Sequence, residues 1–464
     1  MVSIWRIPLV LGCLIQIAHG IDLDVESTDS LKSAAKTIAH GMVSFYKGNE
    51  TCHTPGLLPY PPDGYYWWQA GAMFGALISY WFNTGDTAYN AITSQAILFQ
   101  VGDDIDFMPL NQTTSLGNDD QSFWAMTALS AAEYNFPSPD TPGAPSWLGL
   151  AQAVFNEQIQ RWDSAKCNGG LRWQAVPTNK GFNYKNTISN GCLFNIAARL
   201  ARYTNDQMYA NWAVKIWNWI EAVGFVDTNY RVYDGSDADT YNCTNIDHNQ
   251  WSYNNGILLN GAATMFNYTK GDPIWEHRTA GLLSSANQIF FVDGGIMREG
   301  CENPPAIPCN QDQKSFKAYL ARWMTVTSQL APFTRPNITA LLKTSAKAAA
   351  AQCNGGPSKS TCGIQWDKNG TWDGTEGVGQ SMSALETIIG ALVTTDLKVP
   401  PPFTGSTGVN PGGTSVSVPK AGKNRTATYV DTSVISTADK GGAWFMTILF
   451  LFVGSVSIWF MCSM

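Results

Sequence analysis

The stretch GAMFGALISYWFNTGDTAYN, residues 71–90, carries the pattern that decides the fold. An aromatic-rich run with many small residues closes at Tyr80, a short turn reaches Asp86, and a second apolar run begins. Apolar residues that recur every three to four positions are typical of a helix with one buried face. The same phrase recurs in GCLFNIAARLARYTNDQMYANW (191–212) and GILLNGAATMFNYTKGDPIWEH (256–277), so each copy predicts a helical hairpin.

In the two recurrences, Asp206 and Asp272 stand where Asp86 stands in the first copy. An aspartate at such a junction accepts hydrogen bonds from the free N–H groups that begin a helix, so we expect all three to be N-caps. The helical periodicity extends over the whole chain and predicts about twelve helices. They centre near residues 37, 75, 93, 127, 154, 195, 215, 260, 281, 322, 345 and 385.

Twelve helices in six hairpins predict an all-α fold, and we expect them to close into an (α/α)6 toroid. An open α-solenoid is the alternative. Inner helices crowd the axis of a toroid, which accounts for the many Gly and Ala residues in the repeated phrase. A variant copy, LGNDDQSFWAMTALSAAEY at residues 116–134, begins with two adjacent acids. At the start of an inner helix, Asp119 and Asp120 would lie on the rim of a funnel-shaped mouth.

Two explanations compete for this acidic pair. Asn118 as the N-cap, followed by acids in the first turn, suits the helix dipole, and each acid contributes about 0.3–1 kcal/mol. Glycoside cleavage also needs two carboxyl groups, about 5–5.5 Å apart for retention of configuration and about 6.5–9.5 Å apart for inversion. Neighbouring residues favour the shorter separation. Repulsion between Asp119 and Asp120 would then have to raise the pKa of the acid that donates a proton.

Several motifs occur in a fixed order: GNDDQSFWAMTALSAAEY, YKNTISNGCLFNIAARLARYT, YDG, WSYNNGILLNGAATMFNYT and QDQKSFKAYLARW. They resemble the motifs of glycoside hydrolase family 76, the endo-α-1,6-mannanases, over residues 30 to 395. With the two ends of the chain, the whole sequence is similar to the fungal cell-wall branch of that family. The resemblance implies an (α/α)6 fold and a retaining mechanism, with Asp119 as the nucleophile and Asp120 as the acid/base.

The resemblance also implies the substrate. The donor would be an α-mannoside, the mannose core of a GPI glycan, and the cleaved glycan would be transferred to wall β-glucan. Further sugar-binding candidates lie in or near the motifs, and each has a structural alternative: packing for Trp, capping for Asn, a turn for Asp, an ion pair for Lys and Arg. The two basic candidates, Lys317 and Arg322, could instead meet a phosphate of the glycan. The candidates are Trp67, Trp68, Asn118, Gln121, Trp124, Lys185, Asn186, Asn190, Asp234, Tyr253, Asn255, Lys317 and Arg322.

Both ends of the chain resemble targeting signals. Residues 1–20 combine one positive charge, an apolar run and a small-residue site, which is typical of a secretory signal peptide. Residues 22–396 form the expected catalytic domain, and residues 397–442, rich in Pro, Gly, Ser and Thr, form the expected stalk. Residues 443–464 are apolar and lack a basic flank, which favours a GPI-attachment signal over an ordinary membrane span. We therefore expect a protein of the outer leaflet of the plasma membrane and the cell wall.

Cysteines and sequons agree with passage through the secretory pathway. Without Cys13 and Cys462, which fall in the end signals, eight cysteines remain and suggest four disulfides. Cys301 with Cys309 and Cys353 with Cys362 would close small loops, whereas the partners of Cys52, Cys167, Cys192 and Cys243 stay open. Glycosylation is expected at Asn49, Asn111, Asn242, Asn267, Asn337, Asn369 and Asn424.

Composition and missing motifs narrow the function. A net charge of −7 without basic clusters argues against a nucleic-acid partner. No zinc-protease, nucleophile-elbow or phosphate-loop motif is present, and the acidic run at residues 233–247 does not match a calcium loop, so we expect no metal and no cofactor. We expect a monomer. The alternatives are a non-catalytic glycan-binding wall protein, a simple hydrolytic endo-α-1,6-mannanase, and another (α/α)6 glycosidase such as a β-glucanase.

Overall fold

The computed structural model describes residues 20–59, 64–138, 143–292, 294–302, 308–368, 370–407, 444 and 446–448. The chain forms two units, residues 1–422 and 423–464, and the helical domain belongs to the first. Almost all of the expected signal peptide, most of the stalk and most of the apolar tail lie outside the described residues. Among the described residues, no helix is both long enough and apolar enough to cross a bilayer.

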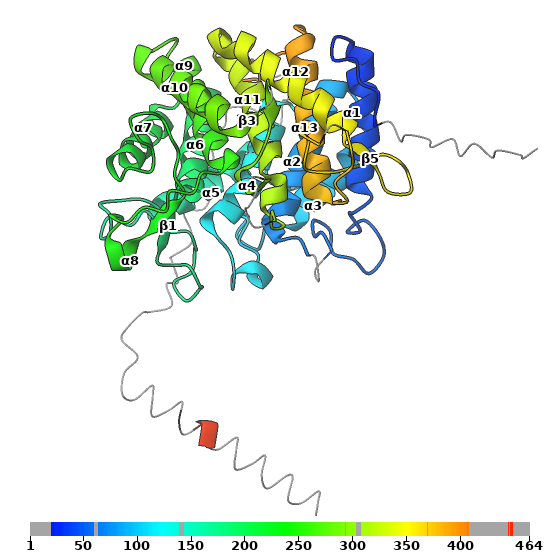
Figure 1. Ribbon diagram of the computed structural model, residues 1–464. Helices are drawn as coiled ribbons and strands as arrows, with labels where there is room; N and C mark the ends of the chain where they lie inside the picture. Colours follow the sequence, from blue (N-terminus) through cyan, green and yellow to red (C-terminus); the bar gives the residue numbers. More distant parts are fainter. Residues whose placement is uncertain are drawn as a thin grey trace, which may run out of the picture. The chain divides into compact units, whose positions relative to one another are not determined.

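Six inner helices form a closed ring, which confirms the toroid and excludes the open solenoid. Each inner helix contacts the next along the chain, and the last contacts the first. Figure 1 shows the helices of this domain and labels all six of the inner ones. The inner helices are α2 (Trp67–Thr84), α4 (Asn118–Glu133), α6 (Thr187–Thr204), α9 (Ser252–Tyr268), α11 (Phe316–Leu330) and α13 (Val378–Thr395).

Six outer helices alternate with the inner ones along the chain, so the expected twelve long helices and their approximate centres are confirmed. The outer helices are α1 (Thr28–Val43), α3 (Asn90–Phe99), α5 (Trp147–Gln160), α7 (Gln207–Ala222), α10 (Pro273–Phe290) and α12 (Arg335–Ala351). A four-residue helix, α8 (Ala238–Tyr241), precedes α9. Short 3-10 turns complete the helical elements: η1 (Leu110–Gln112), η2 (Gly300–Glu302), η3 (Gln313–Ser315) and η4 (Pro332–Thr334).

The described strands are short and form three antiparallel pairs. The first pair joins the loop before α6 to the loop before α9, with Lys185 opposite Ser236 and Asn186 opposite Gly235. It therefore fixes the entry of two inner helices relative to each other. The pairs are β1 (Tyr184–Asn186) with β2 (Gly235–Asp237), β3 (Phe291–Val292) with β4 (Ile296–Met297), and β5 (Cys353–Gly355) with β6 (Thr361–Cys362).

The predicted N-caps are confirmed in two of the three repeated hairpins. Asp206 accepts a hydrogen bond from the N–H of Met208 and caps α7, and Asp272 caps α10 in the same way. The prediction for Asp86 is wrong, because an extra turn separates it from α3, whose N-cap is Tyr89. The Asp86 carboxylate accepts from the N–H of Ala88 in that turn at 3.0 Å and from the hydroxyl of Tyr80 at 2.8 Å.

The inner helices approach so closely that several of their glycines could not carry a side chain. A Cβ atom on Gly71 of α2 would lie 2.8 Å from the indole ring of Trp124 on α4, and one on Gly261 of α9 would lie 2.3 Å from the ring of Phe194 on α6. Small residues on one helix thus make room for aromatic rings on the next. This close packing explains why the repeated phrase mixes Gly and Ala with large rings.

The end of the toroid opposite the helix starts is closed by the chain itself. The N–H of Phe403 donates to the carbonyl of Glu133, the last residue of α4, and the N–H of Gly405 donates to Tyr203 near the end of α6. Arg202 adds hydrogen bonds to the carbonyls of Pro402 and Phe403. The folded domain therefore extends to residue 405, beyond the boundary expected at residue 396.

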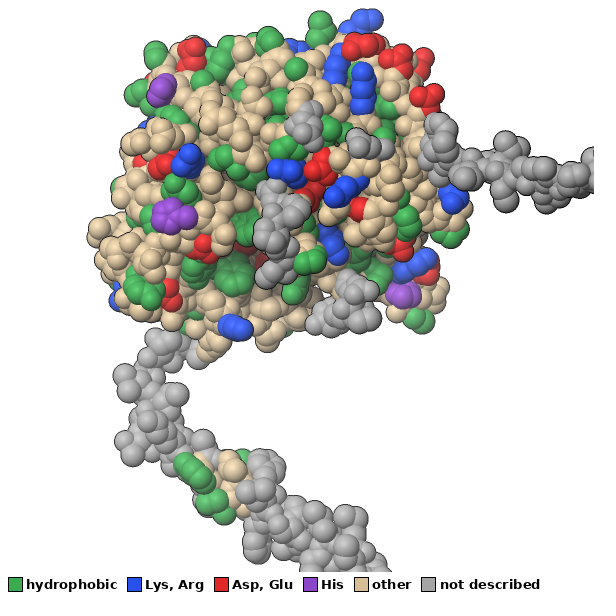
Figure 2. Space-filling view, in the orientation of Figure 1, with side chains coloured by type: hydrophobic (Ala, Val, Ile, Leu, Met, Phe, Trp, Pro, Cys, Tyr) green, Lys and Arg blue, Asp and Glu red, His purple; other side chains and the backbone are tan. Residues whose placement is uncertain are grey.

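Three disulfides are present among the described cysteines, not the expected four. Cys301–Cys309 and Cys353–Cys362 confirm the two predicted pairs, and Cys167 pairs with Cys243. Cys52 is exposed and Cys192 is buried on α6, so they are too differently placed to pair. Asn49, Asn111, Asn242, Asn267 and Asn337 are exposed, as glycosylation requires, whereas Asn369 and Asn424 lie outside the described residues. In Figure 2 acidic and basic side chains are interspersed over the visible face.

Candidate active site

A pocket opens where the N-terminal ends of five inner helices converge. Its volume is about 250 Å³. Because helix N-termini carry partial positive charge, this end of the toroid favours negatively charged groups. The pocket is lined by Trp68, Asp119, Asp120, Phe123, Trp173, Tyr184, Asn186, Asp234, Trp251, Tyr253, Asn310, Asp312, Gln313 and Phe316.

Asp119 and Asp120 are the second and third residues of α4 and both face this pocket. The N-cap is Gly117 and not Asn118, and the N–H of Gly117 donates to the Asp120 carboxylate at 2.7 Å. The Asp119 carboxylate accepts from the hydroxyl of Ser189 on α6 at 3.1 Å. Two neighbouring acids are thus held by different partners, and each has its own fixed orientation.

Distances from Gly117 set an upper limit on the separation of the two carboxyl groups. A Cβ atom on Gly117 would lie 2.5 Å from Oδ1 of Asp119 and 3.2 Å from Oδ2 of Asp120. These two oxygens can be no farther apart than the sum of those distances, which is below the range of about 6.5–9.5 Å for inverting glycosidases. The geometry therefore suits retention, in which one carboxylate attacks the sugar directly.

Burial raises the pKa of both acids, since protein surrounds them on every side except the pocket. The pKa of Asp119 rises to about 7, and hydrogen bonds from its own backbone N–H, from Ser189 and from the indole of Trp173 limit the rise. The pKa of Asp120 is raised well above its usual range by burial and then by the charge of Asp119. Asp119 is therefore the acid that ionises first, and Asp120 is the one that keeps its proton.

Two further carboxylates face the same pocket. Asp234 accepts from the hydroxyl of Tyr184 at 2.9 Å and from the amide of Asn254 at 3.2 Å. Asp312, before α11, accepts from the indole of Trp68, and burial raises its pKa to about 6. Its Oδ1 atom is buried and has no hydrogen-bond partner among the described residues. The lining residues include four carboxylates and no Lys, Arg or His.

Of the predicted sugar-binding residues, the structure places four in the pocket with the acidic pair. Trp68, Asn186, Asp234 and Tyr253 all line it. Asn186 is also the N-cap of α6, where its side chain accepts from the N–H of Ser189. Tyr253 stacks on Phe316 with the ring centroids 3.8 Å apart. Sugar binding by these four residues stays a prediction.

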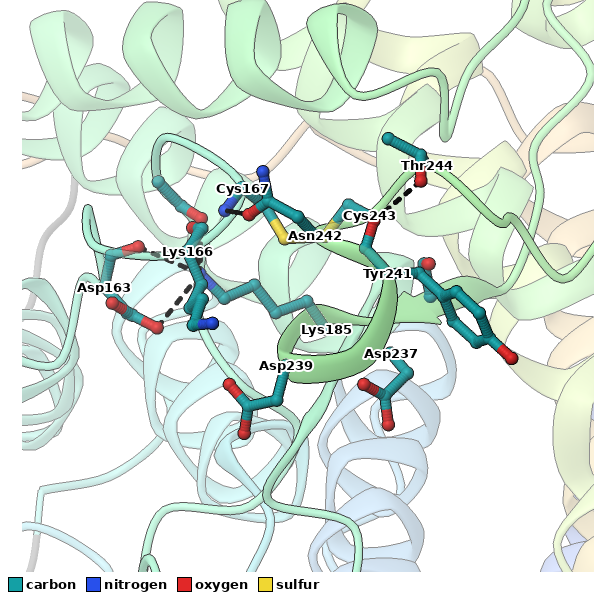
Figure 3. The surroundings of a disulfide bond; sticks show 12 residues. Asp163, Lys166, Cys167, Lys185, Asp237, Asp239, Tyr241, Asn242, Cys243 and Thr244 are labelled. Atoms are coloured by element: carbon teal, nitrogen blue, oxygen red, sulfur yellow. Dashed lines mark hydrogen bonds and ion pairs between the residues drawn. A yellow bond between two sulfur atoms is a disulfide. The ribbon is translucent and has the colours of Figure 1, made fainter.

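Lys185 is next to a pocket residue but points the opposite way. Its ammonium group is fully buried and donates to the carbonyls of Asp163, Lys166 and Gly169, at 2.7–2.9 Å. The carboxylate of Asp163 lies 3.3 Å away. Figure 3 shows this ammonium beneath the loop of the Cys167–Cys243 disulfide. Lys185 therefore holds that loop in place and does not contact the pocket.

The other basic candidates are also structural, which corrects the suggested phosphate site. Lys317 is fully buried, lies 2.9 Å from Glu302 and sits over the ring of Trp366. Arg322 pairs with Glu386 at 2.7 Å inside the ring of helices. Neither lines the pocket, because each neutralises a buried carboxylate elsewhere in the domain.

The remaining candidates support the pocket from behind. Asn118 donates to the carbonyls of Arg172 and Gln174, Asn190 bonds to the backbone of Leu171, and Asn255 donates to Leu282. Gln121 donates to Glu157 and to the carbonyl of Asp106. Trp124 is fully buried against Trp67, whose indole donates to Gln100. None of these side chains lines the pocket.

Sequence reasoning missed several pocket residues. Asp312 stands in the motif QDQKSFKAYLARW and could have been found there as an acid just ahead of an inner helix. Trp173 and Trp251 lie in irregular loops, where no periodicity indicates which way a side chain points. Tyr184 starts a three-residue strand too short to recognise from alternation.

Comparison with known proteins agrees with this geometry. The model of glycosyl hydrolase family 76 matches residues 30–405. Mannan endo-1,6-alpha-mannosidase DCW1 of Saccharomyces cerevisiae is 45% identical over 434 residues, which cover 93% of this chain and 93% of that protein. Mannan endo-1,6-alpha-mannosidase DFG5 of the same yeast is 42% identical over 94% of this chain and 93% of its own length.

The chain belongs to glycosyl hydrolase family 76. The resemblance inferred from the motifs is thus confirmed, and the protein is a glycoside hydrolase. Among solved structures, Dfg5 from Chaetomium thermophilum in complex with glucosamine has a TM-score of 0.80 and 44% identity, over 86% of this chain and 97% of that one. The α-1,6-mannanase of Salegentibacter sp. shares the fold, with a TM-score of 0.61 and 18% identity over 78% of this chain and 99% of that one.

Proposed function

We propose that this glycoside hydrolase of family 76 is a retaining enzyme that cleaves α-1,6-linked mannose, with Asp119 as the nucleophile and Asp120 as the acid/base. The observation that carries the proposal is the pair of adjacent carboxyl groups in one pocket, close enough for retention. The order of their pKa values supports the division of roles, since a nucleophile must be ionised when its neighbour holds a proton.

The reaction has two steps. The Asp119 carboxylate attacks the anomeric carbon while Asp120 gives its proton to the departing glycosidic oxygen, so that an ester to Asp119 forms and the acceptor-side sugar leaves as an alcohol. An incoming hydroxyl then loses its proton to Asp120 and displaces Asp119 from the sugar. Both acids return to their starting states, and the new glycosidic bond has the original configuration.

The natural donor that we propose is the mannose core of a GPI glycan. The curated relatives are named mannan endo-1,6-alpha-mannosidases, and the related Dfg5 structure contains glucosamine. Glucosamine has a free amino group and is cationic at neutral pH. A pocket lined by four carboxylates and no basic side chain suits such a sugar better than it suits a phosphate.

The proposed acceptor is a hydroxyl of wall β-glucan, so that the enzyme transfers a GPI-linked protein to the wall, where the chain itself would be held by a GPI anchor. The aromatic side chains Trp173, Trp251 and Tyr253 support this role, because aromatic rings offer faces on which an acceptor sugar can pack. Water as the acceptor would instead give a simple endo-α-1,6-mannanase.

The variants Asp119→Asn and Asp120→Asn test the proposal. Each should still bind an α-1,6-mannoside, and each should lose nearly all cleavage of it, by about a thousandfold or more. Binding with unchanged activity in both variants would contradict it, and wild-type protein that binds without cleaving would indicate a glycan-binding protein. Incubation with a GPI-glycan donor and a labelled glucan oligosaccharide, followed by mass analysis, distinguishes transfer from hydrolysis.

A further inference from the structure

Trp173 has an unusual position beside the acidic pair. It lies in the loop between α5 and β1 and is 37% exposed, although it is one of the largest apolar side chains. Its ring lines the pocket, and its indole N–H lies near the carboxylate of Asp119, where it acts as a donor that favours the charged form. A Cβ atom on Gly117 would lie 3.3 Å from this indole nitrogen. The nitrogen therefore lies beside Gly117, as the carboxylates of Asp119 and Asp120 do.

The backbone fixes Trp173 to the start of the catalytic helix. Its carbonyl accepts from the N–H of Asn118 at 2.7 Å, and its own N–H donates to the carbonyl of Tyr184 at 2.6 Å. The backbone of Trp173 is therefore hydrogen-bonded to Asn118, which precedes Asp119, and to Tyr184, the first residue of β1.

The ring of Trp173 is held as firmly as its backbone. Gly181 packs against it so closely that a Cβ there would lie 2.5 Å from the ring, and the φ of Gly181 is +92°, a conformation that favours glycine. One side of the ring is covered in this way while another part stays open to the pocket. A loop residue with no helix or strand of its own is thus rigid.

We propose that Trp173 is a positioning residue for Asp119, which it aims at the anomeric carbon through its indole N–H while its exposed ring forms the adjoining sugar-facing wall of the pocket. This inference rests on the proposed role of Asp119 as the nucleophile. A hydrogen bond to the charged form of a carboxylate favours that form, so Trp173 also keeps Asp119 ionised at lower pH than burial alone would allow.

Other groups around Asp119 act on the same ionisation. Asp312 before α11 opposes it by its charge, whereas Asp120 on α4 still holds its proton and is neutral when Asp119 ionises. Ser189 on α6 favours it by donating a hydrogen bond. Cys192 on α6 and Tyr253 on α9 face the acid pair with pKa values raised well above their usual ranges, mainly by burial, so both stay neutral. Trp173, like Ser189, is therefore a donor that limits the rise in the pKa of Asp119.

The substitution Trp173→Phe tests the proposal, because it keeps an aromatic ring and removes the N–H. The pKa of Asp119 should rise, so the acidic limb of the pH profile of kcat/KM on an α-1,6-mannoside should move to higher pH by about one unit. At a pH below that limb, kcat/KM should fall by about tenfold, while the melting temperature changes little.

Trp68→Phe is the matched control, since Trp68 donates its indole N–H to Asp312 in the same pocket. Loss of that bond favours the neutral form of Asp312, which removes negative charge near Asp119, so the acidic limb should stay in place or move to lower pH. An upward shift in Trp173→Phe without one in Trp68→Phe supports the proposal.

Equal shifts in both variants, or no upward shift in Trp173→Phe, would overturn the role of Trp173. Failure of the proposed function gives a different result, because cleavage would then survive in Asp119→Asn. The variant Trp173→Leu removes ring and N–H together; it should show the same upward shift and, in addition, a higher KM because the sugar-facing wall is lost. An unchanged KM in Trp173→Leu would overturn the part of the proposal that concerns the ring.

Discussion

Gly117 decides how the two acids are arranged, although it carries no functional group. Its backbone N–H holds Asp120, and the space at its Cα is filled by the carboxylates of Asp119 and Asp120 and the indole of Trp173. Its φ of −81° is open to any residue, so the requirement for glycine is one of space and not of backbone conformation.

Gly117→Ala should therefore impair catalysis more than folding. The new methyl group would lie 2.5 Å from Oδ1 of Asp119 and force that side chain to move. A displacement of about 1 Å at a reacting group can cost about a hundredfold in rate, so we expect kcat to fall by about that factor. Steady-state kinetics and thermal unfolding measure the two effects. Unchanged kcat in a folded variant would show that the Asp119 carboxylate need not occupy this position.

At the scale of single residues, sequence alone predicts the acids better than their surroundings. Asp119 and Asp120 stand out because charge at the start of an apolar helix is conspicuous. Sequence alone could not decide the roles of Lys185, Lys317 and Arg322, because their partners are distant along the chain. Lys185 binds backbone carbonyls of a loop, those of Asp163 and Gly169, and Arg322 pairs with Glu386 on α13. A sequence shows that a side chain is charged, but not which carbonyl groups a folded loop brings to it.

At the scale of elements, the loops before the inner helices need supports of their own. The loop of Asp163–Gly169 is joined to the segment after α8 by the Cys167–Cys243 disulfide, and to β1 by the buried ammonium of Lys185. Burial lowers the pKa of Lys185 to about 8, yet Asp163 keeps the group charged at neutral pH. This support lies directly behind Asn186 and Tyr184, which line the pocket.

Lys185→Met should destabilise the domain strongly. The substitution leaves buried carbonyls without a donor, and removal of one partner of a buried ion pair costs about 3–5 kcal/mol. Thermal or urea unfolding measures the loss, and Lys180→Met, an exposed position in the same loop region, is the control that should change stability little. A raised KM with unchanged stability in Lys185→Met would instead support the sugar-binding role that was first predicted for it.

Elements were predictable where they repeat. The phrase around Tyr80, Tyr203 and Tyr268 identified three inner helices, and the periodicity located the rest. The expected N-cap at Asp86 failed because the turn there is longer, and Asn118 was displaced from the cap by Gly117, whose N–H is bound by Asp120. Loop lengths and side-chain reach decide such details, and neither follows from hydrophobic periodicity.

At the scale of the whole molecule, the domain buries acids whose pKa values lie far above their usual range. Burial raises the pKa of Asp119 and Glu299 to about 7 and that of Asp312 to about 6, from ordinary values of 3.8, 4.5 and 3.8. Glu299 is fully buried and accepts hydrogen bonds from the N–H groups of Ser252 and Gly300, so it supports the start of α9 from another loop.

The fold should accordingly be most stable at mildly acidic pH. Between the ordinary values near 4 and the folded values near 7, the folded protein holds protons that the unfolded chain has released, so stability falls as the pH rises through this window. We expect a higher melting temperature at about pH 5 than at about pH 8, and a flatter dependence in Glu299→Gln, which cannot ionise. A melting temperature that rises between these two values would contradict the assignment.

The measurement that tests the account most directly is to trap the covalent intermediate with an activated fluorosugar of mannose configuration and to map the labelled peptide by mass spectrometry. An ester on Asp119, absent in Asp119→Asn and still formed in Asp120→Asn with this activated leaving group, is the predicted result. Label on Asp120, or no adduct together with a product of inverted configuration, would contradict the assignment of the two acids.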